Sequence, residues 1–375
     1  MSPQTATAPR RNDVAPALPF PIAARQMSRF SFTTGTTPLS ASAPIQVSPI
    51  QIPAVGYLRY IMLEVTVTGT GGTTPAFTAD APFNVLQAVE FRTAAGNDLI
   101  VPLTGYQLYL ANKWGAQLGT APYTDARVGR QYSATAPSAH FFLGIPLEFD
   151  AETGLGSIPA LASNRSYQLA LTLAAVSTVL TGAPTVNVSI NGTAYYWNEP
   201  PATTQSGVSQ ATQPYGLGTI SQWQLDAPPV TPGDKLIKSN NTGGILSTLI
   251  FTVRNSSGAR IDTNGLTGPS ELYLDNEPMF YLTQNEWEAL MIRTYGFTAS
   301  AKDAALGLDT GVYVIPFHAL AGGLAGDPAN SRSQLLPTLD ASQLQLRSTF
   351  GSAASTLEIM TNAVIPTSSQ VIYSK

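Results

Sequence analysis

From residue 44 onward, apolar and polar residues alternate along much of the chain. Residues 63–68 read Leu-Glu-Val-Thr-Val-Thr, and residues 167–173 place Tyr or Leu at every second position. Such a period of two is typical of strands that bury one face and expose the other. Turn-rich clusters, including residues 69–72 and 255–258, separate these runs at the spacing of a β-sandwich. The pattern predicts an all-β protein.

Two short segments are predicted to be helices instead. Thr104 is followed three residues later by Gln107, and Thr283 by Glu286. Both pairs fit a capping box, in which the Thr hydroxyl accepts from a free helix amide and the Gln or Glu side chain reaches back. The second box lies 179 residues after the first (283 − 104). We expect each helix to lay a narrow apolar stripe against its own sandwich.

Other short motifs recur in the same order along both halves of the chain. The paired motifs are Val65 with Val253, Ile145-Pro146 with Ile315-Pro316, and Ile158-Pro159 with Leu336-Pro337. Each match is short, but their common order indicates two copies of one fold. The sequence therefore predicts a first sandwich over residues 44–198 and a second over residues 219–375. Residues 199–218, which begin after Trp197 and contain Pro200 and Pro201, are predicted to be the linker.

Residues 1–43 are rich in Pro, Ala, Thr and Ser and are predicted to form an N-terminal arm. One interpretation is a disordered terminus. The other is an ordered arm that lies against a neighbouring subunit or an anionic interior surface. Basic and aromatic side chains favour the second interpretation, and the candidate contact residues are Arg10, Arg11, Arg25, Arg29, Phe20 and Phe30.

Charge is unusually sparse. Charged residues make up 11% of the chain, against about 25% in ordinary soluble domains. A secreted β protein with Ser-, Thr- and Asn-rich loops could have this composition, and so could a subunit whose sides are covered by other copies. Depletion of charge at interface cores favours the subunit. The net charge of −4 is too small to indicate nucleic acid as a specific partner.

No targeting segment is visible in the sequence. No stretch approaches the roughly 20 apolar residues that a membrane-spanning helix needs. The apolar stretch at residues 14–24 is interrupted by prolines, so we do not expect it to be a signal peptide.

Candidate chemistry is equally sparse. The chain has no cysteine and two histidines, His140 and His318, both expected to be structural. No nucleophile, phosphate-binding or zinc-protease motif is present. The carboxylate pairs 150/152 and 286/288 have structural explanations, in a turn and in a helical first turn. We therefore expect no enzyme activity, no catalytic or metal-binding residue, no cofactor and no small-molecule substrate.

The order of strand and turn motifs resembles that of a known family. Residues 81–86 (Ala-Pro-Phe-Asn-Val-Leu) lead to Val89-Glu90-Phe91 and then to residues 105–109, while Tyr195-Tyr196-Trp197 precedes the linker. In the second half, residues 336–340 precede Leu344-Gln345-Leu346, and residues 356–359 lead to Asn362. This order is similar to that of the double jelly-roll major capsid proteins of tectivirus-like icosahedral bacteriophages with internal membranes, and of related viruses.

The resemblance implies two tandem eight-stranded jelly-roll sandwiches with one short helix inserted in each. It also implies a structural protein of the virion, in which homotrimers with a pseudo-hexagonal outline assemble into an icosahedral capsid in the host cytoplasm. Expected partners are neighbouring trimers, minor capsid or penton proteins, and an internal lipid membrane reached by the arm. The alternatives are a carbohydrate-binding spike, penton or adhesin-like module with two sandwiches, and a β-sandwich enzyme acting on polysaccharide.

Overall fold

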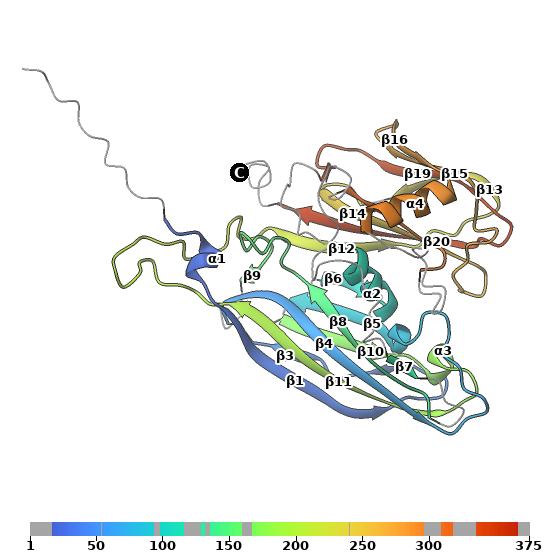
Figure 1. Ribbon diagram of the computed structural model, residues 1–375, viewed down its shortest axis with the longest axis horizontal. Helices are drawn as coiled ribbons and strands as arrows, with labels where there is room; N and C mark the ends of the chain where they lie inside the picture. Colours follow the sequence, from blue (N-terminus) through green and yellow to red (C-terminus); the bar gives the residue numbers. More distant parts are fainter. Residues whose placement is uncertain are drawn as a thin grey trace, which may run out of the picture.

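The computed structural model describes residues 17–53, 55–93, 98–115, 129–131, 136–159, 167–239, 241–295, 309–317 and 335–366. Four antiparallel sheets form two sandwiches that lie side by side (Figure 1). Helices in the described part are few: α1 (Phe20–Ala23), α2 (Gly105–Trp114), α3 (Val176–Val179), α4 (Gln284–Tyr295) and the 3-10 turn η1 (Phe83–Val85).

The first sandwich pairs a six-stranded sheet with a five-stranded one. The larger sheet has the order β1 (Gln26–Pro38), β11 (Thr185–Trp197), β4 (Tyr57–Thr70), β8 (Ser138–Pro146) and β7 (Gly129–Gln131), with β9 (Ile158–Pro159) paired to β4. The smaller sheet has the order β2 (Ile45–Gln46), β10 (Tyr167–Leu173), β5 (Leu86–Thr93) and β6 (Asp98–Leu103), with β3 (Ile50–Ile52) paired to β10.

The second sandwich repeats this topology. Its first sheet has the order β12 (Ile220–Asp226), β20 (Thr356–Ile365), β14 (Ile245–Arg254) and β17 (Val312–Pro316), with β18 (Leu336–Pro337) paired to β14. Its second sheet has the order β13 (Gly233–Ser239), β19 (Leu344–Phe350), β15 (Leu266–Leu274) and β16 (Glu277–Leu282). In both sandwiches, the first strand pairs with the last, the last with the third, and a helix follows the strand at the edge of the smaller sheet. Two eight-stranded jelly rolls account for this order, and β3, β7, β9 and β18 are additions to it.

The alternation in the sequence sets which side chains form the cores. Along β4, Ile61, Leu63, Val65 and Val67 are fully buried and the residues between them are half-buried. β10 buries its odd-numbered residues in the same way. One hydrophobic cluster runs through both jelly rolls without a break.

The predicted arm differs from the observed structure over residues 26–38. These residues form β1, which pairs with β11 along its length and supplies the first strand of the first jelly roll. The segment is rich in Ser and Thr, and two register shifts interrupt its pairing, so its sequence lacks the clean alternation of the other strands. The first jelly roll therefore begins before residue 44.

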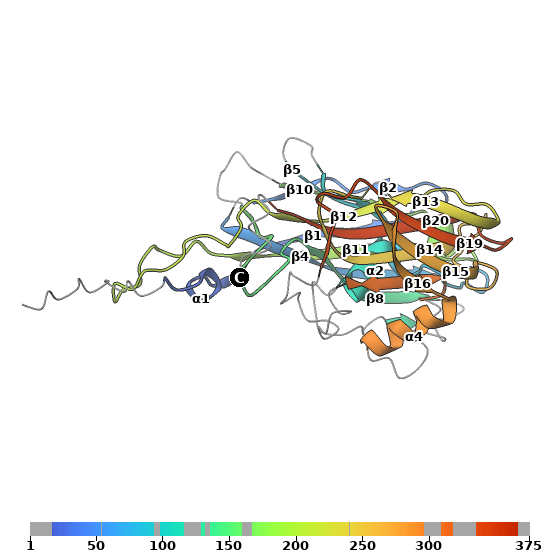
Figure 2. The same ribbon diagram turned by 90° about the horizontal axis from the view of Figure 1, so that it is seen from above.

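The predicted linker carries some ordered structure. Leu18 bridges Gln210, and the Leu18 amide donates to the Ser209 carbonyl at 2.9 Å. Residues 17–24 and the linker thus form one projection, which extends beyond the two sandwiches in both views (Figures 1 and 2).

Candidate assembly interface

The two jelly rolls meet along the outer face of the sheet that contains β14. All ten residues of β14 are buried, so both faces of this strand are covered. Its inner face packs in the second jelly roll, and its outer face lies under α2 of the first jelly roll, while β6 lies against β12 (Figure 1). The central residues of this outer face, Thr248, Ile250 and Thr252, carry no charge, and the charged residue at its end, Arg254, is paired.

Helix α2 has no room for a larger residue at its end. A Cβ atom built on Gly115 would lie 2.4 Å from the Ala111 carbonyl oxygen and 2.6 Å from Cζ2 of Trp223, a fully buried residue of β12. Glycine at position 115 therefore avoids a clash with its own helix and with the second jelly roll. We predicted that α2 would bury only a narrow apolar stripe against its own sandwich, and this prediction underestimated how much of the helix is buried. Most of its residues are buried, because the helix lies between the two jelly rolls.

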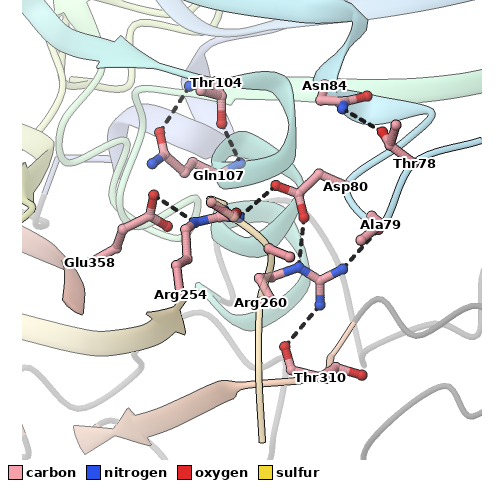
Figure 3. Close-up of polar contacts among 12 residues, drawn as sticks. Thr78, Ala79, Asp80, Asn84, Thr104, Gln107, Arg254, Arg260, Thr310 and Glu358 are labelled. Atoms are coloured by element: carbon pink, nitrogen blue, oxygen red, sulfur yellow. Dashed lines mark hydrogen bonds and ion pairs between the residues drawn. The ribbon is translucent and has the colours of Figure 1, made fainter. Parts of the chain in front are cut away.

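A group of charged residues crosses the interface beside α2 (Figure 3). Asp80 of the first jelly roll accepts from Arg260 Nε at 2.6 Å and from Arg254 Nη1 at 2.8 Å. Arg254 also pairs with Glu358 at 2.9 Å. The Arg260 guanidinium lies 4.6 Å from the centre of the Tyr106 ring, so the phenol is enclosed by the cluster. Burial raises the pKa of Tyr106 well above its ordinary value, which keeps the ring neutral.

Arg260 also binds the backbone on both sides of the interface. Its Nη2 donates to the Ala79 carbonyl at 2.8 Å, and its Nη1 donates to the Thr310 carbonyl at 2.9 Å. The planar guanidinium thereby joins a loop of the first jelly roll to the start of β17 in the second. Sequence reasoning missed these residues. The available signal was the position of Arg254, at the end of an otherwise uncharged strand in a chain with few charges.

Both helix caps form as mutual pairs. The backbone amide of Gln107 donates to Thr104 Oγ1 at 3.2 Å, and the backbone amide of Thr104 donates to the side-chain oxygen Oε1 of Gln107 at 2.9 Å. At the second helix, the Glu286 amide donates to Thr283 Oγ1 at 3.3 Å and the Thr283 amide donates to Glu286 Oε2 at 2.8 Å. The Glu286 carboxylate accepts from both the backbone amide and the hydroxyl of Thr283, and these two hydrogen bonds lower the pKa of Glu286.

Phe20 is the only aromatic residue of α1 and is buried at the base of the projection. Its ring makes edge contacts with Tyr57 at 5.3 Å and with Trp197 at 6.1 Å between centroids. Trp197 in turn donates from Nε1 to Glu148 Oε1 at 2.6 Å, and Arg59 pairs with Glu148 Oε2 at 2.6 Å. Burial raises the pKa of Glu148, and the contacts with Arg59 and Trp197 oppose that shift.

The other predicted arm residues lie in different surroundings. The Arg25 backbone amide donates to Asn198 Oδ1. Phe30 is half-buried and packs 5.9 Å from Phe32 between ring centroids. The side chain of Arg29 and all of Arg10 and Arg11 lie outside the described residues.

His140 lies on the outer face of β8 and is exposed. Its Nε2 lies 2.8 Å from Glu64 Oε1, and Asn191 donates to Glu64 Oε2 at 3.2 Å. These contacts lower the pKa of Glu64, with the hydrogen bond from His140 as the largest cause. His318 lies outside the described residues. Within the part of the chain that the structure describes, no group of three His, Cys, Asp or Glu side chains is placed to hold a metal ion, and no helix is long and apolar enough to cross a membrane.

Comparison with known proteins gives a clear result at the level of structure. No protein-family model and no curated protein matches the sequence. Among solved structures, the STIV major capsid protein (Sulfolobus turreted icosahedral virus) is 15% identical, with a TM-score of 0.61 over 92% of this chain and 100% of that chain. The PBCV-1 capsid protein VP54 is 14% identical, with a TM-score of 0.59 over 91% of this chain and 94% of that one. The Faustovirus major capsid protein is 8% identical, with a TM-score of 0.58 over 91% and 90%. The chain has the double jelly-roll fold of these capsid proteins.

Proposed function

We propose that the protein is a structural subunit of an icosahedral viral capsid, most simply its major capsid protein. The observation that carries this proposal is the fold as a whole. Two jelly rolls of the same topology are joined by a buried interface, and the arrangement matches capsid proteins over more than nine-tenths of the chain. A structural role in the virion, rather than an enzymatic one, agrees with a chain whose side-chain clusters serve packing.

Three copies with six similar lobes would give a homotrimer with a pseudo-hexagonal outline, which tiles a lattice with one kind of subunit. The low charge content supports extensive contact between copies, because charged residues are depleted in interface cores. The buried interface between the jelly rolls supports the same assembly, since six lobes form a regular outline only if each pair keeps a fixed orientation.

The remaining partners are part of the proposal. Neighbouring trimers and minor capsid or penton proteins would complete the shell, and assembly would take place in the host cytoplasm. The basic N-terminal residues, including Arg10 and Arg11, would reach an internal membrane or a neighbouring subunit. Attraction between arginine side chains and anionic headgroups supports the membrane contact.

Solution mass and electron microscopy of the purified protein test the function. We expect a stable species of three times 39.5 kDa, and hexagonal capsomers in micrographs of assembled material. A monomer at all concentrations would contradict the proposal. Saturable sugar binding by that monomer would favour the alternative of a carbohydrate-binding module.

A further inference from the structure

Exposed apolar side chains gather on the outer face of the smaller sheet in the second jelly roll. Among the large apolar residues that are exposed in the described chain, Leu236 lies on β13, and Met279 and Tyr281 lie on β16. Leu236 is 58% exposed and Tyr281 is 61% exposed. This sheet lies on the side of the second jelly roll away from the first, so the interface between the jelly rolls does not cover it (Figure 1). Exposed apolar residues that share one face indicate a contact surface.

The corresponding face of the first jelly roll has a different character. The outward residues of its central strands β10 and β5 are small or polar: Gln168, Ala170, Thr172, Ala88, Glu90 and Arg92. Both jelly rolls have the same strand order, so the fold itself does not require Leu236 and Tyr281 at the surface. The difference indicates a contact that only the second jelly roll makes.

Four residues form one row across this sheet. Leu236 of β13 pairs with Arg347 of β19. Arg347 pairs in turn with Glu271 of β15, and Glu271 pairs with Tyr281 of β16. Residues paired in neighbouring strands project from the same face of a sheet, so these side chains lie side by side. From one edge of the sheet to the other, the row is therefore apolar, positive, negative and apolar.

This order of side chains is complementary to itself. A two-fold axis parallel to the strands reverses the order of the row but leaves its level along the strands unchanged. Two copies of the sheet that meet face to face across such an axis bring Arg347 of each copy opposite Glu271 of the other. Leu236 of each copy comes opposite Tyr281 in the same way. Sheets that pack face to face keep their strand directions within about 30° of each other, which fits this arrangement.

We infer that the outer face of β13, β19, β15 and β16 joins neighbouring trimers, and that its partner is the same face of a second copy of this chain. The contact is isologous, because the same residues contribute from both sides. The inference rests on the proposed capsid function, and it requires that these strands stand along the two-fold axes normal to the shell. Tyr, Met and Arg, which this face exposes, are the residue types enriched in protein interfaces.

The charged pair at the centre of the row is held in place by its own chain. Arg347 donates from Nε and Nη2 to Asp234 Oδ2, at 3.0 Å and 2.7 Å. Its Nη1 lies 3.7 Å from Glu271 Oε2, and the Arg347 side chain is 50% exposed. A guanidinium already fixed in orientation loses less conformational entropy when it meets the Glu271 side chain of a second copy. The charges thereby specify the alignment of the two faces, while Leu236 and Tyr281 supply the apolar area.

Charge reversal tests the contact, with the association of purified trimers measured by sedimentation velocity. Arg347→Glu brings like charges together twice in each contact, and Glu271→Arg does the same with the opposite sign. Each variant alone should raise the dissociation constant between trimers by about tenfold or more. When trimers of the two variants are mixed, every facing pair again has opposite charges. The mixture should therefore associate about as tightly as the wild type.

A matched control comes from the first jelly roll. Arg92 lies beside Glu90 on the corresponding sheet, and its side chain is 39% exposed. Arg92→Glu makes the same change of charge outside the proposed contact, so it should leave the dissociation constant between trimers unchanged. All three variants alter solvent-accessible side chains and should keep the mass of the trimer and its melting temperature.

Crosslinking tests the alignment of the two faces directly. The chain has no cysteine, so introduced thiols react without background. Trimers that carry Leu236→Cys are mixed with trimers that carry Tyr281→Cys and treated with a short bis-maleimide, and a covalent dimer of chains is expected. Trimers that carry Leu236→Cys alone should give none, because the two copies of position 236 lie about three strand spacings, or roughly 14 Å, apart along the row.

The outcomes separate this contact from the proposed function. Wild-type trimers that do not associate at any concentration, or a mixture of Arg347→Glu and Glu271→Arg trimers that associates no better than either alone, would overturn the inference and leave the capsid function standing. A wild-type protein that stays monomeric would overturn both. Weak association of each variant, its recovery in the mixture and the specific covalent dimer would together establish the contact.

Discussion

Lys113 at the end of α2 and Asp309 just before β17 form an ion pair between the two jelly rolls, although they are 196 residues apart in sequence. Their Nζ and Oδ2 atoms lie 2.5 Å apart, and the side chains are 5% and 1% exposed. The Lys113 ammonium also lies 5.0 Å from the centre of the Trp114 ring. Removing two charges from water is costly, so this pair is stable only while both partners are present.

The first prediction concerns this pair. Lys113→Met or Asp309→Leu alone should lower the free energy of unfolding by about 3–5 kcal/mol, because each leaves a buried charge without its partner. The double variant should recover most of that loss, since two apolar groups need no compensation. Chemical denaturation of all four proteins measures the coupling. Additive losses in the double variant would show that the two charges act independently.

The second prediction concerns Asp80, which neutralises two arginines at the interface. Asp80→Asn should destabilise the protein by about 3 kcal/mol, because Arg254 and Arg260 keep their charge in a buried site. The control is Asp234→Asn, whose pair with Arg347 is half-exposed and solvated. We expect little change in the control. Equal losses for both variants would contradict a special role for the interface cluster.

The third prediction is a dependence on pH. Burial raises the pKa of Glu148 above its ordinary value of 4.5. The folded protein therefore holds a proton on the Glu148 carboxyl group more tightly than the unfolded chain does. The contribution of Glu148 to stability is therefore largest below pH 4.5 and falls as the pH rises through its folded pKa. The free energy of unfolding is measured across this pH range for the wild type and for Glu148→Gln. Plotted against pH, the two should have different slopes.

An internal control has the opposite sign. The pKa of Glu286 is lowered by its cap hydrogen bonds, so its contribution is present above its ordinary value of 4.5 and is lost as the pH falls. Glu286→Gln should therefore change the slope of the free energy of unfolding against pH in the direction opposite to that of Glu148→Gln. Identical pH profiles for Glu148→Gln and the wild type would refute the assignment.

The fourth prediction concerns the base of the projection. Phe20→Ala should lower the free energy for local opening of residues 17–24 by about 3 kcal/mol, because it removes the ring that packs on Tyr57 and Trp197. Hydrogen exchange of the Ala24 amide, which donates to the Phe20 carbonyl, reports this opening. Ile22→Ala is the matched control from the same helix, since Ile22 is 70% exposed. Protection of Ala24 that is unchanged in Phe20→Ala would rule out this anchor.

The fifth prediction concerns the first helix cap. Thr104→Ala should cost about 1 kcal/mol of stability, because the Gln107 amide loses its acceptor. Thr104→Ser keeps the hydroxyl and should recover most of that loss. Thermal unfolding of both variants gives the comparison, and equal stability of the Ala and Ser variants would contradict the role of the hydroxyl.

Several features could be predicted because they depend on neighbouring residues. The alternation along β4 and β10 sets which face is buried, and the Thr-x-x-Gln and Thr-x-x-Glu patterns mark where α2 and α4 begin. The repeated motifs also occupy corresponding places: Pro146 and Pro316 face equivalent strand positions, and β9 and β18 each pair with the start of the third strand of their jelly roll.

What the sequence by itself determined is the strand pattern, the helix starts and the duplication, because each is set by interactions within a few residues or by a repeat. Only the tertiary structure decided that Gln26–Pro38 belongs to the first sheet, since its polar, bulged strand is held by pairing with β11, more than a hundred residues away. The tertiary structure also decided which sheet face is covered. The outer face of β14 is buried because α2 packs on it, whereas Met62 and Glu64 on the outer face of β4 are half-exposed.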